Sequence, residues 1–181
     1  MTRFRLPLLL ATLVLLAGCG FHLRNQIALP TDLGPVRVVG ATTSYSALVT
    51  SLSRGLQAAG ATLAAPIGED EDATAGEQVA TLRITSERWG DLPIAVDQFG
   101  RAQEFSLRYA VVFAFTKADG TDLVPQQVVE LSRDYVSPPQ DATGTTTERE
   151  VLAEELRREM AASILRRVDG VVRSGQVNTA R

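Results

Sequence analysis

The strict alternation of side chains between residues 105 and 115 constrains the fold more than any other feature of this chain. The odd-numbered positions carry large apolar residues: Phe105, Leu107, Tyr109, Val111, Phe113 and Phe115. Small or polar residues, including Ser106, Arg108, Ala110 and Ala114, stand between them. Because successive side chains of a strand point to opposite faces, this period of two predicts a β-strand with one face in a hydrophobic core. A cofactor-binding stripe is the alternative, and the core interpretation is preferred.

Three further segments have strand patterns. Residues 36–39 are β-branched and bounded by turn residues, and Leu82 and Ile84 alternate with polar residues towards Trp89. Residues 127–136 place Val129, Leu131 and Tyr135 on one face. The glycine-containing segments 97–101 and 119–120 fit hairpin connections, so the last three predicted strands form an antiparallel succession.

Two segments have the helical period instead. Leu48, Leu52 and Leu56 recur every fourth residue and predict a helix over residues 45–59, with Ser44 as its cap and Gly60 as its stop. Gly55 inside this helix suggests close packing against another element. A second helix starts at a capping box formed by Thr147 and Glu150 and ends at Asp169-Gly170. Its buried stripe consists of Leu152, Leu156, Met160, Ile164 and Val168.

The order strand, helix, three strands, helix predicts an α+β fold. It is a two-layer sandwich in which two helices cover one face of a mixed four-stranded sheet, because a strand-helix-strand unit favours a parallel crossover. We expect a single domain over residues 36–170, followed by a polar tail over 171–181. The acidic run 68–77 is expected to be a solvated loop, with a calcium site as the alternative.

The N-terminus has the pattern of a lipoprotein signal peptide over residues 1–18. Arg3 and Arg5 precede an apolar run over residues 6–16, which is too short to span a bilayer comfortably. Leu16-Ala17-Gly18-Cys19 then matches the bacterial lipobox, in which the cysteine receives a diacylglycerol. We therefore expect a covalent lipid on Cys19 and a lipid-anchored tether over residues 19–35. Gly20 stands where an inner-membrane retention signal would usually carry aspartate, so the outer membrane is the expected destination.

Composition argues against several classes of function. The formal net charge is −3, and loss of residues 1–18 would lower it to near −5 (16 basic against 21 acidic residues), which disfavours nucleic acid as a partner. Cys19 is the only cysteine, so no cysteine-based metal site can form, and His22, the only histidine, is expected to be a packing or hydrogen-bonding residue and not a catalyst. We expect no enzyme activity and no cofactor besides the covalent lipid.

Several segments together resemble the LptE family of lipopolysaccharide-assembly lipoproteins. The resemblance begins at the lipobox and the following Gly20-Phe21-His22-Leu23-Arg24, and continues through Ala59-Gly60-Ala61. It includes Phe99-Gly100-Arg101, Gln103-Glu104-Phe105 and the last helix over residues 150–168. This resemblance implies a heterodimer with the large β-barrel protein LptD, which the lipoprotein plugs and helps to assemble. It also implies contact with lipopolysaccharide, and assistance in its delivery to the outer leaflet.

Contact with lipopolysaccharide requires cations that face the lipid A phosphates. Arg101, at the expected tip of a hairpin, is the first candidate, and Arg88, Lys117 and Arg133 are weaker ones. Solvated arginines on a sheet surface are the alternative explanation of these weaker candidates. The alternative function is that of a free, periplasm-facing lipoprotein that binds a ligand without any barrel partner.

We predict that Cys19→Ala abolishes lipidation and weakens membrane anchoring, because no other residue of the chain can carry the thioether. Mass spectrometry of the mature N-terminus measures this directly. An unmodified Cys19 in the wild-type protein, or a mature chain that starts elsewhere, would contradict the prediction.

Overall fold

A computed structural model describes residues 27, 29–30, 33–41, 46–66, 79–137 and 142–179. Cys19 and its lipobox, Ser44 and the acidic run 68–77 lie outside these residues. The described elements follow the predicted order of strand, helix, three strands and helix. None of the described helices is long and apolar enough to cross a membrane.

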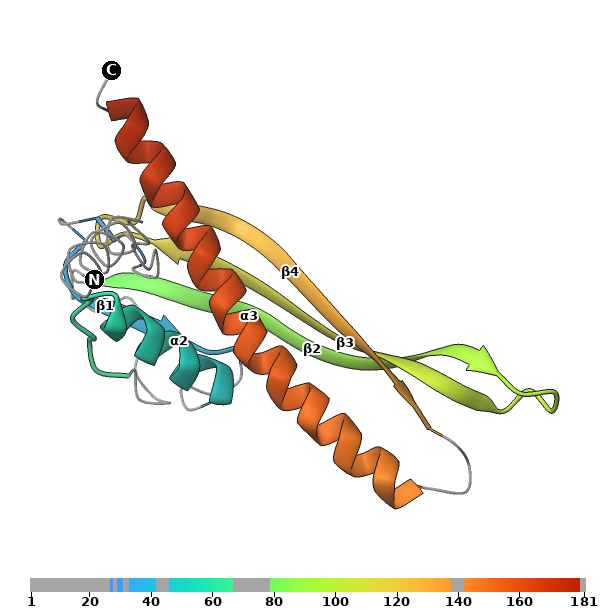
Figure 1. Ribbon diagram of the computed structural model, residues 1–181. Coiled ribbons are helices and arrows are strands. Elements are labelled where there is room, and N and C mark those ends of the chain that lie inside the picture. Colours follow the sequence, from blue (N-terminus) through green and yellow to red (C-terminus); the bar gives the residue numbers. More distant parts are fainter. Residues whose placement is uncertain are drawn as a thin grey trace, which may run out of the picture.

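The strands form one mixed sheet in the order β1-β2-β3-β4 (Figure 1). The elements are β1 (Val36–Val39), β2 (Ala80–Val96), β3 (Ala102–Thr116) and β4 (Asp122–Val136). β1 runs parallel to β2, and the other neighbouring strands are antiparallel. The predicted α+β class and mixed four-stranded sheet are therefore confirmed.

The first helix, α2 (Ala47–Ala58), begins slightly later than the sequence suggested. Ser46 is its N-cap, and the Ser46 Oγ accepts a hydrogen bond of 3.2 Å from the Val49 amide. The prediction of Ser44 as the cap is thus wrong, because Ser46 lies at the spacing from which a side chain reaches the N3 amide. The stop at Gly60 is confirmed, since its φ of +92° is one that glycine adopts without strain.

The last helix, α3 (Ala142–Thr179), is longer than predicted at both ends. The capping box is wrong, because Thr147 and Glu150 lie inside the helix. The predicted stop at Asp169-Gly170 is also wrong. Val172 continues the buried stripe four residues after Val168 and is only 4% exposed, so burial outweighs the cost of about 1 kcal/mol of a helical glycine. Residues 171 and 172 therefore pack with the core and do not begin a polar tail.

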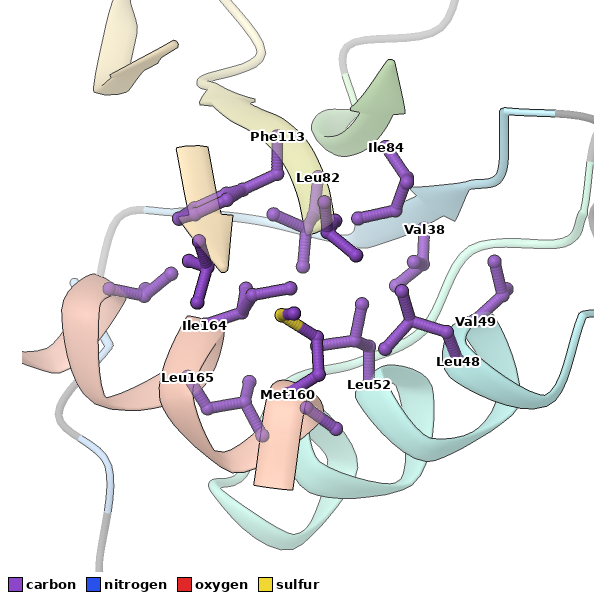
Figure 2. Close-up of a cluster of buried hydrophobic side chains, with 14 of the residues drawn as sticks. Val38, Leu48, Val49, Leu52, Leu82, Ile84, Phe113, Met160, Ile164 and Leu165 are labelled. Carbon is purple, nitrogen blue, oxygen red and sulfur yellow. The ribbon is translucent and has the colours of Figure 1, made fainter. Parts of the chain in front are cut away.

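Both helices cover the same face of the sheet, as predicted (Figure 1). Figure 2 shows side chains from α2, α3 and the sheet meeting in one cluster. Its labelled members include Leu48, Leu52, Leu82, Ile84, Phe113, Met160 and Ile164. The odd-numbered residues of β3 lie on this face, and Tyr109, Val111, Phe113 and Phe115 have no exposed surface.

A β-bulge between Ile84 and Ser86 changes which residues of β2 face the helices. Before the bulge, Leu82 and Ile84 stand beside Phe115 and Phe113 of the core face. After it, the odd-numbered residues Glu87, Trp89 and Asp91 take that position. One extra residue in a strand reverses the side-chain alternation, so Trp89 joins the helix-covered face despite its odd number.

Gly55 marks a close approach of the two helices, which confirms its predicted role. A Cβ atom at this position would overlap with Cδ1 of Leu165 on α3. Leu165 is only 6% exposed, so its side chain has little room to withdraw. The absence of a side chain at Gly55 therefore lets α2 pack directly against α3.

A double-mutant cycle tests this contact. Gly55→Ala alone gains about 1 kcal/mol of helix propensity but overpacks the site at a cost of about 1–3 kcal/mol, so it should leave the free energy of unfolding unchanged or lower. In a Leu165→Ala background the overlap is gone, and Gly55→Ala should stabilise the protein by about 0.5–1 kcal/mol. Urea unfolding measures all the variants. Equal effects of Gly55→Ala in both backgrounds would contradict the contact.

Candidate functional site: the hairpin arm

The far ends of β2 and β3 form a hairpin that runs beyond the helices in Figure 1. We call residues 91–107 the hairpin arm. Its turn is built around Asp97, whose Oδ1 accepts hydrogen bonds from the amides of Phe99 (2.8 Å) and Arg101 (3.0 Å). The Oδ2 accepts from the Nε of Arg101 (2.8 Å) and the Nε2 of Gln103 (3.2 Å). A single carboxylate thus fixes both the backbone and the side chains of the tip.

Arg101 lies at the exposed tip beside Phe99, where the sequence predicted it. Its guanidinium carbon is 5.3 Å from the centre of the Phe99 ring, and its Nη2 is 2.7 Å from Asp97 Oδ2. Desolvation raises the pKa of the Asp97 carboxyl, but the hydrogen bonds from Arg101 and Phe99 outweigh it, so the net pKa is lowered. The Arg101 side chain is still 54% exposed. The tip therefore presents an aromatic ring and a guanidinium that already has a carboxylate partner.

The other predicted cations do not gather around Arg101. Lys117 follows the opposite end of β3, and the 15 residues of that strand span about 50 Å at about 3.3 Å per residue. Arg133 faces α3, where its Nη2 pairs with Glu159 (2.6 Å) and Glu155 (3.5 Å). Arg88 lies on the face of the sheet opposite the helices and donates to Ser86 Oγ (3.2 Å). The four cations therefore form no common site.

The arm also carries exposed apolar side chains that the sequence analysis did not single out. Leu92, Ile94, Val96 and Phe99 are among the exposed large hydrophobic residues, and Phe99 is 72% exposed. The spacing of the first three was the available signal, because apolar residues two apart on a regular strand share a face, although irregularities between Pro93 and Val96 interrupt that alternation here. Apolar side chains gathered on a projecting hairpin are typical of a contact surface.

The base of the arm is attached to α3 through Asp91. The Arg149 guanidinium of α3 donates from Nε to Asp91 Oδ1 (2.9 Å) and from Nη2 to Oδ2 (2.8 Å). The Tyr135 hydroxyl of β4 donates to the same Oδ1 (2.9 Å). The hydrogen bonds from Arg149 hold the pKa of Asp91 below its usual value, despite opposing desolvation. Three elements thus meet at one carboxylate.

An aromatic pair lies one step further along the sheet. Trp89 stacks on Tyr109 with ring centres 3.8 Å apart, and Arg157 of α3 lies 5.2 Å from the Trp89 ring centre. The Tyr109 hydroxyl donates to Glu87 Oε1 (2.7 Å), and burial together with this bond raises the pKa of Tyr109. In this half of the sheet, arginine side chains of α3 therefore contact a carboxylate and an aromatic ring. In the other half, α3 contacts the sheet through apolar side chains.

A metal site requires several ligating side chains close together, and a phosphate-binding pocket is favoured by cationic side chains. Within the described part of the chain, no group of three or more histidine, cysteine, aspartate or glutamate side chains could hold a metal ion. A cavity of about 440 Å³ lies at the other end of the molecule, between the segment before β1 and the turn after α2. Leu29, Leu33, Gly60 and Ala61 are among its lining residues, and the described lining contains no charged side chain. This cavity is therefore poorly suited to binding a phosphate group.

Comparison with known proteins gives consistent results. Residues 33–168 match the family described as "LptE: Lipopolysaccharide-assembly". The LPS-assembly lipoproteins LptE of Yersinia pestis (strain Pestoides F) and Yersinia pseudotuberculosis serotype O:1b (strain IP 31758) are each 29% identical over 164 residues. Each match covers 90% of this chain and 74% of the relative.

Two solved structures share the fold. The rare lipoprotein B from Shewanella oneidensis has a TM-score of 0.60 at 20% identity, over 82% of this chain and 100% of that one. A lipoprotein B from Nitrosomonas europaea has a TM-score of 0.63 at 22% identity, over 88% of this chain and 96% of that one. At these identities, the likeness establishes the fold alone.

The contact at Asp91 predicts a specific pH dependence. Because the pKa of Asp91 in the folded protein is lowered below the usual value of an aspartate, the contact adds stability above the unfolded pKa and loses it as the pH falls through the folded pKa. Asp91→Asn should therefore lower the free energy of unfolding above about pH 5, by less than about 1 kcal/mol for so exposed a pair, with the difference vanishing in acid.

Urea unfolding between about pH 2 and pH 7 measures this difference, over the range in which a carboxylate titrates. Arg149→Gln is the matched variant, because it removes the same ion pair from the α3 side and should lose the same acid dependence. Parallel stability curves for the wild-type protein and Asp91→Asn would show that the pair does not contribute.

Proposed function

This chain belongs to the LptE lipopolysaccharide-assembly family, and on that premise we propose that it works as a lipid-anchored plug of an LptD-type β-barrel in the outer membrane. In this role it helps to assemble the barrel and assists delivery of lipopolysaccharide to the outer leaflet. The observation that carries the proposal is the family match over residues 33–168, which includes the whole sheet and most of α3.

The dimensions of the fold support a position inside a barrel. The 17 residues of β2 span about 55 Å at about 3.3 Å per residue, well beyond the roughly 30 Å hydrocarbon core of a bilayer. A long two-layer body can thus fill a lumen across the whole membrane. Its face opposite the helices bears charges of both signs, such as Arg88, Arg108 and Glu130, which suits the polar interior of a large outer-membrane barrel.

The proposed anchor lies close to the folded domain in the sequence. Seven residues, 20–26, separate Cys19 from Ile27, and at most about 3.6 Å per residue they reach about 25 Å. Ile27 and Leu29 pack against the core, and Leu29 lines the same cavity as Pro35, directly before β1. A lipid on Cys19 would therefore hold the domain at the inner leaflet surface and raise its effective concentration near a barrel in the same membrane.

We further propose that Arg101 contacts a phosphate of lipopolysaccharide. The support is its exposure at the tip and the neighbouring apolar side chains of the arm, which suit acyl chains. Such a phosphate has to compete with Asp97, which already binds the same guanidinium. Arg88, Lys117 and Arg133 remain weaker candidates, and Arg133 is the weakest because Glu155 and Glu159 both bind it.

Affinity purification from membranes tests the plug. A tagged full-length chain extracted in mild detergent should bring down a large β-barrel protein in a near-stoichiometric complex. If the proposal holds, the chain is not expected to be recovered as a stable monomer. Recovery of a folded monomer without a barrel, at every detergent concentration tested, would contradict the plug function and support the alternative of a free ligand-binding lipoprotein.

Because Asp97 and a phosphate would compete for the Arg101 guanidinium, substitutions of Arg101 and Asp97 should change the affinity for lipopolysaccharide in different ways. Arg101→Ala should lower affinity for lipopolysaccharide about tenfold, the loss expected for one charge-assisted hydrogen bond. Asp97→Asn removes the competing charge and should leave the affinity unchanged or raise it, whereas Gln103→Ala serves as a control that perturbs the same turn. Melting temperatures establish that each variant is folded. Equal losses in all three variants would show that the tip is only structural.

A further inference from the structure

The two edges of the sheet differ in their protection. Along the β1 edge, the Val36 amide donates to Thr62 O (2.8 Å) and the Ala64 amide donates to Val36 O (2.9 Å). Arg37 Nε donates to Ala65 O (2.8 Å) on the same edge. At the opposite edge, β4 pairs with β3 alone within the described residues. An unprotected strand edge presents backbone donors and acceptors that another strand can use.

The backbone groups at the open edge follow from the register. The Ser137 amide donates to Gln103 O (2.7 Å), which makes these two residues a hydrogen-bonded antiparallel pair. Such pairs recur at every second residue, so the odd-numbered residues from Gln127 to Tyr135 bond to β3. The even-numbered residues point their amides and carbonyls away from the sheet: Val128, Glu130, Ser132 and Asp134.

Protection along this edge is slight. Pro125 lies in the irregular stretch of β4 between the residues paired with Phe113 and Phe115. Its missing amide therefore removes no regular hydrogen bond between β3 and β4. Arg133 Nη1 donates to Ser132 O (2.9 Å) and occupies one outward carbonyl. Beyond these, residues 127–136 offer an edge of about 33 Å at about 3.3 Å per residue, with Val128 58% exposed.

The surroundings of the edge favour a basic partner. A hollow of about 220 Å³ at its far end is lined by Glu104, Asp134, Tyr135, Val136 and Glu148. Glu130 stands on the same face as Asp134, four residues away along β4, and its Oε1 already lies 3.5 Å from Arg108 Nη1. A strand added here would place alternate side chains beside the carboxylates of the hollow, where Lys or Arg gains a cross-strand pair.

We propose that the outer edge of β4, from Val128 to Asp134, binds an extended segment of the barrel partner by strand addition, with a basic side chain of that segment in the acidic hollow. The inference rests on the proposed plug function. The wall strands of a closed barrel are paired on both sides, so the added strand comes from a luminal loop or terminal segment of the partner. Main-chain hydrogen bonds supply the affinity, and the carboxylates supply the preference for a basic segment.

Ser132→Pro tests the edge, because it removes an outward amide and leaves the bonds between β3 and β4 in place. In the full-length lipoprotein it should lower barrel recovery about tenfold, the loss of roughly one main-chain hydrogen bond plus a steric clash. Ser132→Ala keeps the amide and should recover the barrel as the wild-type chain does. Normal barrel recovery with a folded Ser132→Pro variant would overturn strand addition at the β4 edge but not the proposed plug function. Failure of the wild-type chain to recover any barrel would overturn the plug function itself.

Crosslinking keeps the inference testable if Ser132→Pro misfolds. A photoreactive amino acid that replaces Glu130 in the otherwise unchanged lipoprotein, kept in its membrane, should form a crosslink to the barrel. The same group at Thr50, on an exposed part of α2, should not. Peptide mapping of the adduct should identify a partner segment that contains Lys or Arg. Crosslinks from Glu130 only to a second copy of this chain, or to nothing, would overturn strand addition by the partner.

Discussion

Burial of one face of β3 is the constraint on which the rest of the structure depends. β3 pairs with both β2 and β4, so its apolar stripe runs along the middle of the sheet. Phe113 and Phe115 are fully buried, and each aromatic ring contributes on the order of 2–3 kcal/mol when it leaves water. The large aromatic residues lie on this face alone, and the other face carries polar and small residues together with Val112. Both helices therefore have to pack on that face, and the opposite face remains open to a partner or to water.

The same strand joins two halves that are held together by different forces. In one half, Met160 and Ile164 of α3 pack on Phe113 and Leu82 in a dry cluster. In the other, Leu156 of α3 is buried as well, but half-exposed ion pairs such as that of Arg149 with Asp91 add to the attachment, and each such pair is worth below about 1 kcal/mol. The first turns of α3 and the hairpin arm thus belong to the part of the molecule that opens at least free-energy cost. A contact surface that adapts to a partner benefits from this difference.

The sequence predicts those features that depend on long, regular patterns. The stripe of β3, the order of elements and the close approach at Gly55 all followed from local periodicity or from one residue type. The failures arose where tertiary contacts override local signals. Gly170 is a reasonable helix stop until the burial of Val172 is known, and Thr147 fits a capping box only if the preceding turn is not helical. No local signal reveals the bulge after Ile84, which decides the face of Trp89.

The candidate site shows the same limit more sharply. The exposure of Arg101 at a hairpin tip follows from its turn, but its pairing with Asp97 depends on side-chain geometry that sequence does not fix. Asp91 and Arg149 are 58 residues apart, and nothing in their separate surroundings indicates that they meet. The register nevertheless orients the molecule. β1 begins beside the first residue of β2, so the N-terminal tether enters at one end of β2 and the hairpin tip lies at its other end. In the proposed complex, anchor and tip therefore act at opposite poles of an elongated body, and the open edge of β4 runs between them.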